Sequence, residues 1–102
     1  MKKLDFKVPM VDVFGKVSQY QGREILLSDS LAEALGANPG KIKVRKAIGW
    51  ARALGNGDSL VLDESDFEDL AEYIEEGAPL IAVCKVSLLE IMDEAKIEEG
   101  KK

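Results

Sequence analysis

Apolar and polar residues alternate over short distances near the start of the chain, a pattern typical of antiparallel strands. Val11-Asp12-Val13 follows this pattern, and Glu24 precedes a run of apolar residues. Turns are expected at two glycines, Gly15 and Gly22. We therefore predict a small antiparallel meander or pair of hairpins over residues 10–27, joined by a short strand at residues 59–62.

Two helices are predicted between residues 28 and 54. The first begins at a cap within residues 28–30, where Ser and Asp side chains can accept amide hydrogen bonds, and ends at Gly36. The second runs over residues 41–54, with Trp50 at the edge of its apolar stripe. Helical spacing predicts that the residues facing the core are Leu31, Ala34 and Leu35, followed by Val44, Ala47, Ile48, Ala51 and Leu54.

Two further helices are predicted in the second half of the chain. The third begins at Asp63 or Ser65 and ends at Gly77, while Pro79 is suited to opening the fourth. Residues 80–83 are apolar all round, so periodicity leaves open whether residues 80–86 form a helix or a buried strand. The predicted core residues are Phe67, Leu70, Ala71 and Ile74, followed by Ile81, Cys84, Leu88, Ile91 and Ala95.

These elements predict a single α+β domain over residues 1–102, in which a small antiparallel β-meander or hairpin packs against three to four α-helices. A chain of 102 residues with 46% hydrophobic residues can bury roughly 65% of its surface, enough for one core. No apolar run approaches the ~20 residues that span a bilayer. Charged residues interrupt the region where a secretory signal would lie. We therefore expect a cytoplasmic protein with no membrane partner.

Several kinds of chemistry are excluded by what the sequence lacks. Histidine is absent and Cys84 is the only cysteine, which rules out an internal disulfide, a Cys/His zinc site and a mechanism that needs an imidazole. Ile42 stands where a phosphate-binding loop ending in Gly40-Lys41 needs Ser or Thr. Glu68 stands where a calcium-binding loop starting at Asp63 needs glycine. We predict no enzymatic activity, catalytic residue, cofactor, metal or small-molecule substrate.

Charge is divided unevenly along the chain. Residues 1–57 hold ten Lys/Arg and five Asp/Glu, a net charge of +5, while residues 58–102 hold four Lys and fourteen Asp/Glu, a net charge of −10. These charges form either ordinary solvated helix faces or complementary patches that steer subunits into a head-to-tail ring or stack. The candidate interaction surface comprises Lys41, Arg45, Trp50 and Arg52 in the second helix and Asp66, Asp69, Glu72 and Glu76 in the third.

Nucleic-acid binding is the alternative from another class. Residues 31–46 resemble a degenerate helix-turn-helix unit, with Ala and Gly at close-packing positions and Ile42 early in the second helix. Arg45 departs from this pattern, because such units have an apolar residue there. The residues available to contact DNA phosphates are Lys41, Lys43, Arg45, Lys46 and Arg52.

The order of these signals resembles that of small proteins encoded in bacteriophage and prophage genomes. The matching segments cover nearly the whole chain: Val11–Lys16, Gly22–Leu27, Leu31–Leu35, Lys46–Ala47, Leu62–Asp66, Pro79–Ile81 and Leu88–Glu90. The last two helices depart from the pattern, since Ala82–Lys85 is less polar than expected. The resemblance implies a phage-related α+β protein and brings no catalytic residue with it.

The function favoured by the sequence is therefore non-enzymatic. We expect a phage-related component of a protein–protein interaction or assembly, whose partner is another protein or a second copy of the chain. The opposite-charge faces form the predicted docking surface, and the helix over Leu80–Met92 is a second, apolar candidate. The alternative is a nucleic-acid-binding regulator that uses residues 31–46.

Overall fold

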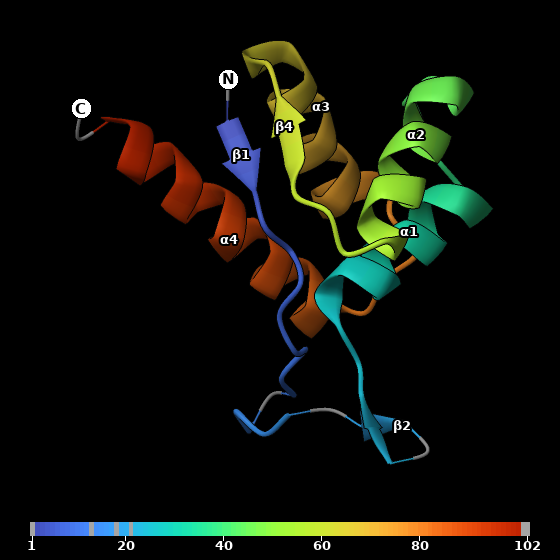
Figure 1. The fold of residues 1–102 in the computed structure, drawn as a ribbon, viewed down its shortest axis with the longest axis vertical. Coiled ribbons are helices and arrows are strands. Elements are labelled where there is room, and N and C mark those ends of the chain that lie inside the picture. The colour runs from blue at the N-terminus through green and yellow to red at the C-terminus, as the bar shows by residue number, and fades with distance from the viewer. Residues whose placement is uncertain (1, 13, 18, 21, 101–102) are drawn as a thin grey trace.

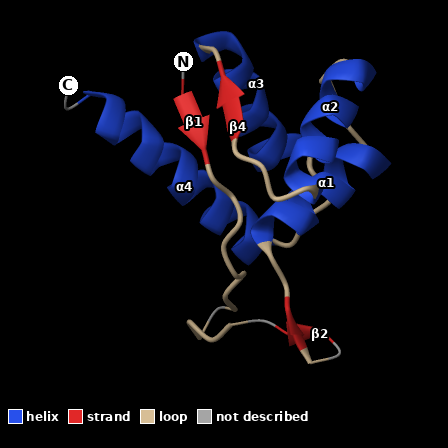
Figure 2. Ribbon diagram, in the orientation of Figure 1, coloured by secondary structure: helices blue, strands red, loops and turns tan. Residues whose placement is uncertain are grey.

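Helices predominate in the residues that the structure describes, which are 2–12, 14–17, 19–20 and 22–100 (Figures 1 and 2). Short antiparallel strand pairs accompany them, so the predicted α+β class is confirmed. The computed structural model has the following elements in chain order: β1 (Lys2–Leu4), β2 (Gln19–Tyr20), β3 (Arg23–Glu24), α1 (Leu27–Ala37), α2 (Val44–Gly55), β4 (Leu60–Leu62), α3 (Glu64–Glu72), a π-helical turn η1 (Tyr73–Gly77) and α4 (Ala82–Gly100).

The strand at residues 60–62 pairs with the N-terminal segment of the chain. β4 lies antiparallel to β1, with Leu60 opposite Leu4 and Leu62 opposite Lys2. The prediction that this strand joins the meander is therefore wrong, and β1 was not predicted at all. The two strands pair because this buries Leu4, Leu60 and Leu62 in the core. A strand of three residues is too short to show an alternating pattern of its own, so periodicity could not predict β1.

Residues 8–26, which we call the arm, form the small antiparallel meander predicted from the sequence. Residues 9 and 26 pair, residues 11 and 17 pair, and β2 pairs with β3. The two predicted turns are confirmed, since Gly15 and Gly22 both have φ of 79°, a conformation that glycine adopts without strain. The arm projects away from the helices (Figures 1 and 2). The predicted alternation at Val13 falls outside the described residues.

α1 begins and ends at residues that differ from the prediction. Its N-cap is Leu26, with no side-chain cap hydrogen bond, so the cap predicted within residues 28–30 is wrong. The amides of Leu27 and Ser28 instead donate to main-chain carbonyls, each at 2.9 Å, which replaces a side-chain cap. The helix also continues one residue beyond the predicted end at Gly36. Its predicted core residues are confirmed as buried: Leu31, Ala34 and Leu35.

α2 begins three residues later than predicted. Ile42, which precedes the helix, enters the core and is 8% exposed, while Val44 is 65% exposed. The prediction that Val44 faces the core is therefore wrong, because Ile42 takes that place from outside the helix. Ala47 and Leu54 are buried as predicted. The rest of the predicted stripe is half-buried: Ile48, Ala51 and, at its edge, Trp50.

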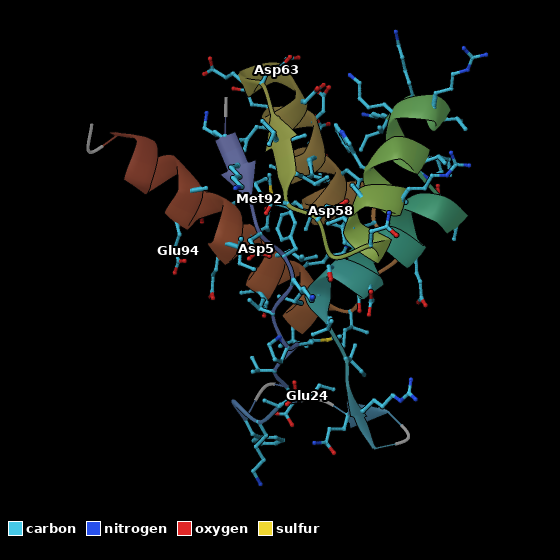
Figure 3. The ribbon with its side chains drawn as sticks, in the orientation of Figure 1. Asp5, Glu24, Asp58, Asp63, Met92 and Glu94 are labelled. Carbon is cyan, nitrogen blue, oxygen red and sulfur yellow. The ribbon has the colours of Figure 1, made fainter. Side chains whose placement is uncertain are left out.

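α3 follows the prediction closely. Its N-cap is Asp63, whose Oδ1 accepts a hydrogen bond from the amide of Asp66 at 2.8 Å (Figure 3). Phe67, Leu70 and Ile74 are buried. The helix then widens into the π-helical turn, which ends at the predicted Gly77, and the amide of Ala78 donates to the carbonyl of residue 73 at 2.7 Å.

α4 begins at Ala82, which answers the question that periodicity left open: residues 82–86 are helical. Ile81 precedes the helix and is 65% exposed, so the prediction that it faces the core is wrong. The buried residues of α4 are spaced by four, at Cys84, Leu88 and Met92. Met92 lies on the side of α4 that packs against β1 (Figure 3), while the predicted Ile91 and Ala95 are only half-buried.

Ser28 leads to a prediction about stability. Its side chain is buried, and its Oγ has no hydrogen-bond partner within the described part of the chain. A buried, unpaired hydroxyl is unfavourable, so Ser28→Ala should raise the free energy of unfolding by about 1 kcal/mol. Urea denaturation measures this change, and Ser30→Ala in the same helix is the control for helix propensity. A loss of stability in the Ser28 variant alone would mean that the hydroxyl has a favourable partner.

Candidate functional site

The basic side of α2 and the acidic side of α3 lie next to each other (Figure 1). Lys46 Nζ donates to Asp66 Oδ1 at 2.6 Å, and Lys41 Nζ lies 3.8 Å from Glu72 Oε1. The hydrogen bond to Asp66, together with neighbouring carboxylates, raises the pKa of Lys46 above its ordinary value. Two lysines, one before α2 and one in it, therefore meet carboxylates of α3 within the same molecule.

An open groove of about 470 Å³ lies beside the pair of Lys41 and Glu72. Its walls come from the α1–α2 connection on one side and from α3 and η1 on the other. Carboxylates predominate among its charged groups, so we call it the acidic groove. Its lining residues are Gly40, Lys41, Ile42, Asp69, Glu72, Tyr73, Glu76 and Gly77. Half of the residues of the predicted interaction surface therefore line the acidic groove.

Tyr73 connects the two walls of the acidic groove through a hydrogen bond. Its ring is buried, and its hydroxyl donates to the carbonyl oxygen of Asn38 at 2.7 Å. Gly40 has φ of +59°, and a Cβ at this position would lie 3.4 Å from the ring; a Cβ at Gly77 would approach the ring equally closely. Burial raises the pKa of the Tyr73 hydroxyl, so the group stays protonated and able to donate at neutral pH.

The remaining predicted residues lie outside the groove. Asp66 is engaged by Lys46. Arg45 and Arg52 are exposed on α2, and in the described residues neither forms an ion pair. Trp50 is half-buried and packs against the core, so most of its side chain closes the core edge. Free positive charge thus lies on the exposed side of α2.

Half of the groove lining was missed by sequence reasoning: Gly40, Ile42, Tyr73 and Gly77. Gly77 was interpreted only as the end of a helix, and Gly40 only as part of a segment that fails the phosphate-binding pattern. Tyr73 follows Leu70 by three positions, so its burial could have been predicted from the spacing of α3. Its hydroxyl would then have required a hydrogen-bond partner, but the sequence does not say that this partner is the main chain of the α1–α2 connection.

The described residues give little support for a metal site or a reactive cysteine. Within residues 2–12, 14–17, 19–20 and 22–100, no cluster of acidic or cysteine side chains is arranged to hold a metal ion. Cys84 is a free thiol that is 1% exposed, and burial raises its pKa, which makes it a poor nucleophile.

Of the helices in the described residues, none combines the length and apolar character needed to cross a membrane.

Comparison of the chain with protein-family models, with curated proteins and with solved structures finds no match. The resemblance to phage-encoded proteins therefore stays a prediction.

Proposed function

We propose that this chain is a non-enzymatic, phage-related interaction module that works in the cytoplasm and associates with a second copy of itself. The docking surface consists of the outer sides of α2 and of α3 with η1, which we call the paired-charge surface. Its residues are those predicted from the sequence: Lys41, Arg45, Trp50, Arg52, Asp66, Asp69, Glu72 and Glu76. The observation that carries the proposal is the acidic groove with unpaired arginines on the helix beside it.

The arrangement of charge favours one geometry of association. A head-to-tail ring needs its two complementary patches on separate parts of the molecule, whereas here the two signs are neighbours, bridged by Lys46 and Asp66. A two-fold axis along the line between α2 and α3 places the arginines of each copy over the carboxylates of the other. Such an isologous contact uses every complementary pair twice, so we propose a two-fold dimer.

Solution mass at two salt concentrations tests this proposal. The Debye length is about 10 Å at 0.1 M salt and about 3 Å at 1 M, so association through exposed charges should be strong at the lower concentration and weak at the higher. We expect the weight-average mass from analytical ultracentrifugation to be larger at 0.1 M salt. An equal mass at both salt concentrations would overturn the proposal.

The same measurement with added duplex DNA tests the alternative function. Six residues separate α1 from α2, whereas a helix-turn-helix has a turn of three to four. Two of the lysines available for phosphate contacts, Lys41 and Lys46, pair with acidic residues of α3. We therefore favour the dimer, for which DNA adds no mass. A mass that rises only with DNA would replace this proposal by the nucleic-acid-binding regulator.

A further inference from the structure

One turn of the arm presents an aromatic side chain to solvent and is closed by hydrogen bonds. Phe14 is 83% exposed. Asp12 Oδ1 accepts hydrogen bonds from the amides of Phe14, at 2.8 Å, and Lys16, at 3.0 Å. The main chain closes the same turn, because the amide of Asp12 donates to the carbonyl of Lys16 at 2.8 Å. An aromatic residue on a preformed turn loses little conformational entropy on docking, which suits it to anchor a contact.

A second groove, of about 260 Å³, lies on the outer side of α1. Alanines of α1 and the segment before α4 form most of its lining, which consists of Ser30, Glu33, Ala34, Ala37, Pro79 and Leu80. The exposed Ile81 directly follows this segment. The groove shares no lining residue with the acidic groove, and its mainly apolar lining suits an aromatic ring rather than a charged group.

Charge matches the arm to this groove. Lys16 lies two residues beyond Phe14 and is exposed, and Glu33 lies at the groove and is exposed. Neither of them forms an ion pair in the described part of the structure. The arm points away from its own helices (Figure 1), and the phenyl ring of Phe14 is exposed to solvent.

We propose that the arm docks on a second copy of the chain, with Phe14 in the groove between α1 and residues 79–81 and Lys16 beside Glu33. The contact joins two different patches, so each copy keeps one free arm and one free groove, and the contact repeats from copy to copy. This inference goes beyond the two-fold dimer, because it uses other residues and depends mainly on apolar burial. Together, the two contacts would build an extended assembly.

The test uses the full chain at 1 M salt, where the paired-charge contact is screened. We expect the mass of the wild-type protein to rise with protein concentration, and Phe14→Ala to weaken this association by about tenfold or more. Val61→Ala is the matched control, since Val61 is also exposed but lies on β4, away from the arm and the groove. A wild-type protein that stays monomeric at 1 M salt, or a Phe14 variant that associates like wild type, would overturn the proposal.

A charge exchange provides a second, independent test. At 0.1 M salt, where the exposed pair of Lys16 and Glu33 is less screened, Lys16→Glu and Glu33→Lys should each weaken association, and the double variant should restore it, because the pair is re-formed with its signs exchanged. Failure of the double variant to recover would contradict the placement of Lys16 beside Glu33. These results are separable from the proposed two-fold dimer, which predicts a difference between low and high salt and does not involve Phe14.

Discussion

Replacing Phe6 by alanine is expected to lower the free energy of unfolding by about 3–5 kcal/mol. The side chain is 0% exposed and belongs to the main core cluster. It lies in the segment between β1 and the arm, and its carbonyl accepts hydrogen bonds from the amides of Val8 and Ser28. Because small domains are stable by only about 5–15 kcal/mol, this one cavity would remove a large part of the stability.

Urea denaturation followed by the fluorescence of Trp50 measures this effect, since Trp50 is the only tryptophan and packs against the core. The chain supplies a matched control: Phe14→Ala removes the same atoms from a side chain that is 83% exposed. At a protein concentration where the chain is monomeric, we expect the control to change the free energy of unfolding by less than about 0.5 kcal/mol. Equal losses in the two variants would contradict the central place of Phe6 in the core.

Reversing the free charges of α2 is expected to abolish association through the paired-charge surface. In the variant Arg45→Glu/Arg52→Glu, the acidic groove of each copy would face acidic residues of the other, and such like-charge contacts cost several kcal/mol. The mass at 0.1 M salt should fall to the value that the wild-type protein shows at 1 M. Both arginines are exposed on α2, so the substitutions should leave the fold intact.

A complementary variant makes this prediction specific. Asp69→Lys/Glu76→Lys reverses the groove instead, so we expect each variant to lose the salt-dependent association alone and an equal mixture of the two to regain it. Lys3→Glu/Lys7→Glu changes the net charge as much as the arginine variant does, but at exposed positions away from this surface. An unrestored mixture, or an equal loss of mass in this control, would contradict the two-fold contact.

Local sequence signals predicted those parts of the fold that depend on neighbouring residues. The Asp63 cap and the turns at Gly15 and Gly22 are examples, because each needs only a few adjacent residues. The prediction failed where a distant partner decides the structure. β1 exists because β4 pairs with it, and α1 needs no side-chain cap because carbonyls near β1 receive its first amides.

The candidate site, too, has one part that local spacing predicts and another that depends on distant contacts. The charged residues of the acidic groove could be predicted, because helical spacing alone places Asp69, Glu72 and Glu76 on one outer face. The groove itself could not be predicted, because it depends on the hydrogen bond from the Tyr73 hydroxyl to the carbonyl of Asn38. These two residues are 35 positions apart in the chain. That Lys46 pairs with Asp66 in the same molecule likewise depends on the packing of α2 beside α3.

The pairing of β1 with β4 has a consequence for synthesis on the ribosome. β1 leaves the ribosome before its hydrogen-bonding partner, Leu60–Leu62, and before α4, against which it also packs. Leu4 therefore lacks its strand partner and the cover of α4 while α1 and α2 are being made. Contacts between residues so far apart in sequence form late and slowly. The nascent chain therefore exposes an apolar, aggregation-prone segment until its second half has emerged.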